Sequence, residues 1–127
     1  MKKIVYTKNA PAPIGPYSQA VRYGNLVLVS GQVAINPATG QFEWGDIRSQ
    51  TKLVMENLKA ILLEEGLSFA EVLKCSIFIK DMNDFPVINE IYGGYFKNEP
   101  PARETVEVAR LPKDALVEIS LIAGIDA

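Results

Sequence analysis

The chain has 127 residues, with 13 basic and 15 acidic side chains, a net charge of −2 at pH 7 and no histidine. This length allows one domain with a sizeable core, so residues 1–127 are expected to form a single domain. The acidic balance argues against a general nucleic-acid binder, and the missing histidine removes the commonest general base and metal ligand.

Cysteine usage and hydropathy indicate in which cellular compartment the protein is expected. Cys75 is the only cysteine, which excludes an internal disulfide and a multi-thiolate zinc site within one chain. It lies in a β-rich run, where a buried packing role is the simplest interpretation. No window approaches the roughly 18 apolar residues of a membrane span, and the N-terminus lacks the apolar region of a signal peptide. We expect a soluble cytoplasmic protein.

The first half of the chain predicts strands followed by a helix. In chain order these are a short β-prone run at 3–7, a stiff proline-rich segment at 9–16, strands at 17–23 and 26–32, and a helix at 46–65. Gly24-Asn25 is a hairpin turn signal, and the apolar run at 26–32 predicts burial on both faces. Apolar residues at 47, 54, 58, 61 and 62 form one helical stripe, which Gly66 is suited to end.

The second half predicts a strand at 72–80, a helix capped by Asn83 or Asp84 and running to about Lys97, and strands near 103–109 and 115–123. The order β-β-β-α-β-α-β-β predicts an α+β domain, with a mixed β-sheet and two helices packed on one face. The other face then has no helices to cover it. Since the strands are rich in apolar residues, we expect that face to be buried in a homo-oligomer.

Two charged residues of opposite sign stand in the last two predicted strands, within PPARETVEVARLPKDALVEI at 100–119. A charge among β-forming residues is costly to bury without a partner, and both Arg103 and Glu118 are so placed. If the strands form a hairpin with an even-numbered loop, Thr105 pairs with Glu118, and Arg103 lies diagonal to it, about 7–8 Å away. An odd-numbered loop places the two charges on opposite faces.

This pair of charges has two interpretations. An ordinary cross-strand salt bridge explains it, and such a bridge contributes little when exposed. Alternatively, the guanidinium fork of Arg103 binds a ligand carboxylate, and Glu118 positions or deprotonates a water. Apolar neighbours would raise the pKa of Glu118 as that role requires. The residue types alone leave both interpretations open.

Several segments resemble the RidA family, also called YjgF or Rid. They are IGPYSQA at 14–20, VSGQ at 29–32 followed by NPATG, IKDMNDF at 79–85, and the segment at 100–119. The resemblance extends from about residue 3 to residue 123, and the motifs agree in order and spacing. It implies a chorismate-mutase-like α+β subunit, a homotrimer with sites between subunits, and no cofactor or metal.

Members of the RidA family are 2-iminobutanoate/2-iminopropanoate deaminases, which hydrolyse reactive enamines and imines to 2-keto acids and ammonia. The resemblance implies the same small-molecule partners here, released by pyridoxal-phosphate enzymes such as serine/threonine dehydratases. Water adds to an already electrophilic carbon in this reaction, so no covalent nucleophile is required. The absence of histidine agrees with such chemistry.

The resemblance also implies roles for individual residues. Arg103 resembles the carboxylate-binding arginine of the family. Gly31, beside Ser30, resembles the residue whose backbone N–H meets the same carboxylate. Tyr17 resembles the aromatic wall of the site, and Asn89 a polar lining residue. Without the resemblance, Tyr17 has a plain packing explanation, and Asn89 is explained as a surface residue of a helix. Gly31, at the end of its predicted strand, marks a place where the backbone can approach another group closely, or it only relieves crowding.

Two further positions complete the implied site. Glu118 resembles the acid that holds the attacking water. Thr105 is the main departure, because many relatives carry a cysteine at this position, two residues past the arginine. If the position acts through its backbone, the threonine changes nothing. If a thiol matters, activity or regulation differs here.

Two other functions stay open at this level. A non-catalytic, carboxylate-binding regulatory module is disfavoured by the presence of Arg103, since some diverged relatives lack this arginine. An activity on RNA or in translation has been attached to some relatives. The acidic balance and the absence of histidine weigh against it, and no nucleic-acid partner is expected.

Overall fold

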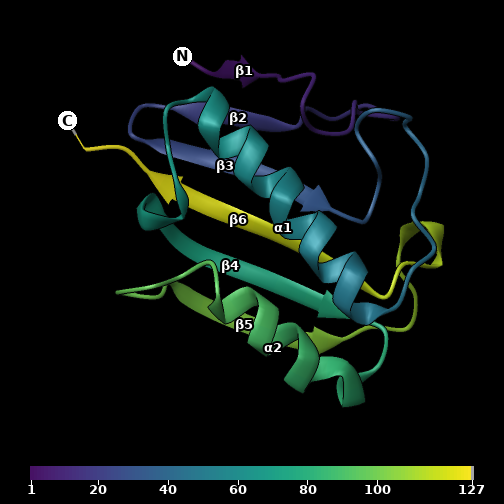
Figure 1. Ribbon diagram of the computed structural model, residues 1–127. Helices are drawn as coiled ribbons and strands as arrows, with labels where there is room; N and C mark the ends of the chain where they lie inside the picture. The colour runs from purple at the N-terminus through teal and green to yellow at the C-terminus, as the bar shows by residue number, and fades with distance from the viewer. Residues whose placement is uncertain (127) are drawn as a thin grey trace.

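The computed structural model describes residues 1–126, whose helices and strands follow the predicted order β-β-β-α-β-α-β-β. The strands are β1 (Lys3–Val5), β2 (Ala20–Tyr23), β3 (Leu26–Gln32), β4 (Val72–Ile79), β5 (Ala102–Glu107) and β6 (Val117–Gly124), and the α-helices are α1 (Ile47–Glu64) and α2 (Phe85–Gly93). Both helices lie on one face of a single sheet (Figure 1). The predicted α+β class, with two helices on one face, is confirmed.

The strand order in the sheet is β1-β2-β3-β6-β4-β5. All neighbouring strands are antiparallel except β4 and β5, which are parallel. A parallel pair requires a crossover connection, and α2 provides it between β4 and β5. The last strand in the chain, β6, therefore lies in the middle of the sheet, and β5 lies at its edge.

Helix α1 has clear start and stop signals. Asp46 caps its N-terminus, with a side-chain oxygen that accepts a hydrogen bond from the Ser49 N–H at 2.8 Å. Gly66 follows its C-terminus at φ 71°, a conformation that glycine adopts without strain. The predicted apolar stripe packs on the sheet through the fully buried side chains of Val54, Leu58, Ile61 and Leu62. The helix prediction is correct to one residue at each end.

Two predicted boundaries were wrong by three residues or more. The second helix was expected to run to about Lys97, but α2 ends at Gly93, where two glycines follow one another and weaken the helix. The strand expected from Tyr17 begins only at Ala20, because Gly15 and Pro16 keep the preceding residues in an irregular path.

Side chains of the central strands alternate between the two faces of the sheet. In β6, Val117, Ile119, Leu121 and Ala123 are buried beneath the helices, while the residues between them are only partly buried. In β3, Leu26 and Leu28 remain 45% and 42% exposed. The sequence predicted that β3 is buried on both faces. Within one chain this prediction is wrong, because no helix covers the second face of the strand.

Candidate active site

A cavity of about 370 Å³ lies beside Glu118. Four of the predicted site residues line it: Tyr17, Ser30, Gly31 and Glu118. The rest of the lining is mostly apolar and consists of Ile14, Val33, Ile35, Pro112 and Lys113. The fold thus brings together the N-terminal segment, the end of β3 and the start of β6. Pro112 and Lys113 belong to the LPKD loop, which sequence reasoning treated only as a connection.

The carboxyl group of Glu118 lies directly against the backbone of Gly31. The β3–β6 register shifts between Val29 and Gln32, so β3 carries an extra residue there, which is a β-bulge. A Cβ added at Gly31 would overlap Glu118 Oε2 and would lie 2.8 Å from Cδ of the same carboxyl. The sequence predicted a close backbone approach at this glycine, and the group that approaches is the Glu118 carboxyl.

Glu118 is half-buried and forms no ion pair with any of residues 1–126. Burial raises the pKa of this carboxyl above its usual value of 4.5. A carboxyl of raised pKa next to a cavity is suited to taking a proton from water and returning it.

The N-terminal segment is held at the cavity by Gln19, whose contribution sequence reasoning missed. Its side chain is buried: Oε1 accepts a hydrogen bond from the Thr7 N–H at 2.7 Å, and Nε2 donates to the Pro11 carbonyl at 2.9 Å. A proline-rich segment has few N–H donors with which to join a sheet, so a side chain supplies the missing bonds. A glutamine next to a proline-rich run is only a weak sequence signal for this.

Ser30 and Tyr17, which also line the cavity, form hydrogen bonds with the same segment. Ser30 Oγ donates a hydrogen bond to the Ser18 carbonyl at 2.6 Å, and the Ser30 N–H donates to the Gln19 carbonyl at 2.9 Å. Tyr17 is 49% exposed, and its hydroxyl oxygen accepts a hydrogen bond from the Ile14 N–H at 3.4 Å. Tyr17 is therefore a wall of the cavity and not a core residue.

Arg103 lies elsewhere, on the edge strand β5. It pairs with Cys75 of β4, and its side chain is on the helix-covered face, where it contacts residues of α2. Nη1 donates a hydrogen bond to Asn89 Oδ1 at 2.7 Å. The rings of Phe85 and Tyr92 have their centroids 5.3 and 5.1 Å from Arg103 Cζ. Asn89, predicted to line the ligand site, thus contacts the arginine itself.

The predicted hairpin between the last two strands is wrong. Strand β4 lies between β5 and β6, with Arg103 opposite Cys75 and Glu118 opposite Phe78. The two charged residues are therefore about 10 Å apart along the strands and about 10 Å apart across them. They also lie on opposite faces, because their β4 partners are an odd number of residues apart. No salt bridge between them is possible within one chain.

Thr105 belongs to the arginine side of the molecule. It pairs with Ile77 of β4 and lies on the same face of β5 as Arg103, two residues away. Its hydroxyl Oγ1 is buried and makes no hydrogen bond with any residue that the structure describes. The seven predicted site residues thus form two groups: Tyr17, Ser30, Gly31 and Glu118 in one, and Asn89, Arg103 and Thr105 in the other.

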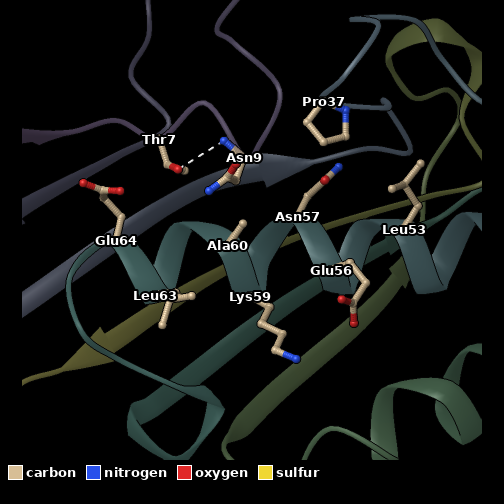
Figure 2. A pocket seen from close by; sticks show the side chains of 10 residues that line it. All are labelled: Thr7, Asn9, Pro37, Leu53, Glu56, Asn57, Lys59, Ala60, Leu63 and Glu64. Atoms are coloured by element: carbon tan, nitrogen blue, oxygen red, sulfur yellow. Dashed lines mark hydrogen bonds between the residues drawn. The ribbon is translucent and has the colours of Figure 1, made fainter.

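A second cavity, of about 390 Å³, lies between α1, the N-terminal segment and the loop at Pro37 (Figure 2). None of the predicted site residues lines it. Two of its polar groups already have protein partners: Asn57 Nδ2 donates to the Ile35 carbonyl at 2.9 Å, and Glu56 Oε2 accepts from the Tyr95 hydroxyl at 2.6 Å.

Among residues 1–126, no helix is long and apolar enough to cross a membrane. The same part of the chain holds no cluster of three or more acidic, cysteine or histidine side chains placed to bind a metal ion.

The fold and the two groups of residues define a small α+β protein with an acid-bearing cavity and a separate guanidinium site. Comparison with known proteins gives the family. The family described as Endoribonuclease L-PSP matches residues 7–125, and the chain belongs to this family, which includes the RidA, YjgF and RutC proteins. The predicted resemblance is confirmed.

Individual relatives match almost end to end. A RutC family protein of Pyrococcus horikoshii is 53% identical, over 97% of this chain and 98% of its own. TdcF of Escherichia coli, named as a reactive intermediate deaminase, is 46% identical over 97% of each chain. The crystal structure of TdcF with bound serine matches with a TM-score of 0.93, covering 98% of this chain and 99% of that chain. RidA from a Psychrobacter species also matches at 0.93, with 41% identity and coverage of 97% and 99%.

Proposed function

We propose that the protein, acting as one RidA-like domain over residues 1–127, is an enamine and imine deaminase. Its substrates would be small 2-imino acids such as 2-iminobutanoate and 2-iminopropanoate, which it hydrolyses to 2-keto acids and ammonia. Membership of a family that includes a reactive intermediate deaminase supports the reaction class. A cytoplasmic location, where pyridoxal-phosphate dehydratases release such imines, is part of the same proposal.

The observation that carries the proposal is the uncompensated charge of Arg103. Its one hydrogen-bond partner among the described residues is the neutral amide of Asn89, and no carboxylate of residues 1–126 forms an ion pair with it. A guanidinium with a free edge is a receptor for a carboxylate, which it binds through two parallel hydrogen bonds. The serine bound in TdcF is a small molecule of this kind and supports the same ligand class here.

A site that uses both Arg103 and Glu118 requires a second copy of the chain. The two residues lie on opposite faces of the sheet, so an arginine from one subunit would meet the Glu118 cavity of its neighbour. We propose a homotrimer with three such sites between subunits. The apolar side chains left on the helix-free face, among them Leu26, Leu28 and Val106, give the subunits a surface to bury.

The proposed chemistry follows from this geometry. Arg103 and the Gly31 N–H hold the substrate carboxylate, while Tyr17 and Ser30 shape the cavity around the rest of the substrate. An enamine first tautomerises to the imine, and water then adds to the C=N carbon as Glu118 accepts a proton from it. Transfer of that proton to nitrogen gives a carbinolamine. A second proton then moves from its hydroxyl group to nitrogen by way of Glu118, and cleavage of the C–N bond releases ammonia and leaves the 2-keto acid. The reaction calls for no cofactor and no metal.

The family description, Endoribonuclease L-PSP, favours an activity on RNA as the second candidate. The net charge of −2 weighs against it, because RNA binding requires a basic surface. A non-catalytic carboxylate-binding module is the third candidate. Carboxylate binding without turnover would favour this module, and ribonuclease activity that survives Arg103→Ala and repurification would favour the second candidate.

The proposal is tested by keto-acid release from 2-iminobutanoate generated by a threonine dehydratase. We expect Arg103→Ala to lower kcat/KM by about a hundredfold or more, since two charge-assisted hydrogen bonds of about 1.5–3 kcal/mol each are lost. Arg103→Lys keeps the charge without the fork and should lose about tenfold or more. Arg48→Ala is the matched control, because Arg48 is an exposed arginine paired with Glu90. No acceleration by the wild-type protein with any amino-acid-derived imine would contradict the proposal.

A further inference from the structure

Three residues of α2 surround the side chain of Arg103. Phe85, Asn89 and Tyr92 are spaced i, i+4 and i+7, so they lie along one stripe of the helix. Asn89 Oδ1 accepts a hydrogen bond from Nη1 at 2.7 Å, and the two rings lie 5.3 and 5.1 Å from Cζ. Two aromatic rings and one amide thus contact a guanidinium on an exposed edge strand.

We propose that Phe85 and Tyr92 are positioning residues which, with Asn89, clamp the Arg103 guanidinium so that its Nε–Nη2 edge stays free for a carboxylate. The identity of that carboxylate rests on the proposed function, but the clamp itself is a property of this chain. A long side chain loses rotamer freedom when it binds a ligand, and a side chain that is already fixed loses less. The clamp therefore increases the affinity for a carboxylate without touching it.

The choice of partners distinguishes a clamp from ordinary packing. A carboxylate would hold the arginine equally well, but it would neutralise the charge and occupy the fork. Aromatic faces attract the guanidinium through its flat surface and leave its N–H groups free. Tyr92 contributes through its ring, whose centroid lies 5.1 Å from Arg103 Cζ, because its buried hydroxyl makes no hydrogen bond to the guanidinium. The three partners thus fix Arg103 while leaving one donor edge unused.

The first test uses the unliganded protein and does not depend on the proposed reaction. The Arg103 Nε–Hε group is observed by ¹⁵N NMR, and in the wild type we expect a resolved signal with a high order parameter. Phe85→Leu and Tyr92→Leu should lower that order parameter, whereas Tyr92→Phe, which keeps the ring, should retain it. Phe96→Leu is the control: Phe96 packs 4.7 Å from the Tyr92 ring but is not one of the rings on Arg103. An order parameter unchanged in both leucine variants would overturn the clamp.

The second test measures binding of 2-oxobutanoate by calorimetry and turnover of 2-iminobutanoate. Loss of either ring should weaken binding about three- to tenfold and raise KM more than it lowers kcat, because a cation–π contact is lost and the reacting atoms are untouched. Wild-type affinity in both leucine variants would overturn the inference. If the wild type itself does not bind 2-oxobutanoate, the proposed function fails, and the NMR measurement alone decides the clamp.

Discussion

Glu118 is held in a position that costs stability. Burial raises the pKa of its carboxyl above the ordinary 4.5, so ionisation favours the unfolded chain. The stability associated with the protonated carboxyl is fully present below about pH 4.5 and is lost as the pH rises through the folded-state pKa. A half-buried acid that forms no ion pair with the rest of residues 1–126 is typical of a functional site.

We therefore expect Glu118→Gln to be more stable than the wild type at pH 7, with a difference that disappears near pH 4. Urea unfolding at the two pH values measures this. Glu104→Gln is the control, and this variant should be less stable than the wild type at pH 7, because hydrogen bonds from Ser76 and Lys74 lower the pKa of Glu104. Its carboxylate stabilises the fold at pH 7, and this stabilisation is lost as the pH falls. A Glu118→Gln variant no more stable than the wild type at pH 7 would contradict the account.

Single residues were predictable where one position carries its own signal. A glycine near the end of a strand predicted a close approach, and Gly31 provides one. Phe85, Tyr92 and Gln19 were missed, because their roles depend on which residue the fold places opposite them. Their sequence signal is a helical spacing or a buried amide, and ordinary core positions show the same patterns. The roles proposed for Arg103 and Glu118 came from the family resemblance, since the hairpin argument for them was wrong.

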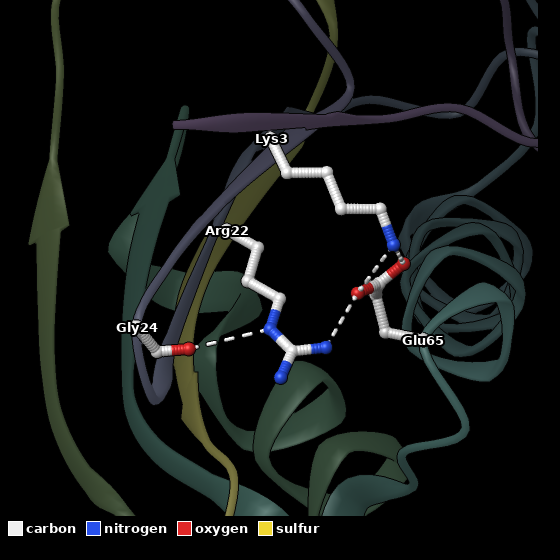
Figure 3. A network of polar contacts seen from close by, with 4 residues as sticks. All are labelled: Lys3, Arg22, Gly24 and Glu65. Carbon is white, nitrogen blue, oxygen red and sulfur yellow. Dashed lines mark hydrogen bonds and ion pairs between the residues drawn. The ribbon is translucent and has the colours of Figure 1, made fainter. Parts of the chain in front are cut away.

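At the level of elements, the end of α1 is joined to the first two strands by one ion-pair network (Figure 3). Glu65, the C-terminal cap of α1, lies 3.1 Å from Lys3 Nζ and 3.3 Å from Arg22 Nη1. Its side chain is only 4% exposed, whereas those of the two cations are 61% and 36% exposed. The network therefore fastens the three-residue strand β1 to the rest of the sheet.

We expect Glu65→Gln to lower the free energy of unfolding by about 1–2 kcal/mol, between the values for exposed and for buried ion pairs. Amide hydrogen exchange in β1 should rise at the same time. Chemical denaturation and exchange by mass spectrometry measure the two effects. Glu64→Gln is the matched control, because Glu64 is exposed and forms no ion pair among the described residues. Equal stability of the two variants would show that the network contributes nothing.

Elements were predictable where the signals are local, and their pairing was not. A cap, an apolar stripe and a glycine delimit α1, and the boundaries of β4 follow from its β-formers. The pairing of β5 was misread because strands adjacent in sequence were assumed to form a hairpin. A strand, a helix and a strand in succession, as in β4–α2–β5, are typical of a parallel crossover. This arrangement pairs β5 with β4, whereas the predicted hairpin paired β5 with β6. The loop before β6 then carries the chain across β4, with Lys113 and Asp114 at φ 61° and 54°.

At the scale of the whole molecule, one chain contains two incomplete halves of the proposed site. The helix-free face carries the Glu118 cavity, and the edge strand carries Arg103. Composition predicted only that one face of the sheet should be covered. Which residues meet across that interface depends on how copies are arranged, and local sequence patterns carry no such information.

The most direct test of the account mixes two inactive variants, Arg103→Ala and Glu118→Gln, by co-expression with different tags and purification of the mixed oligomers. If each site takes its arginine from one subunit and its acid from the neighbour, one of the three sites in every mixed trimer is intact, so the purified mixed trimers should show about one third of the wild-type activity. Each variant alone should stay inactive. Mixed oligomers as inactive as the parent variants would contradict the claim that the site is shared between subunits.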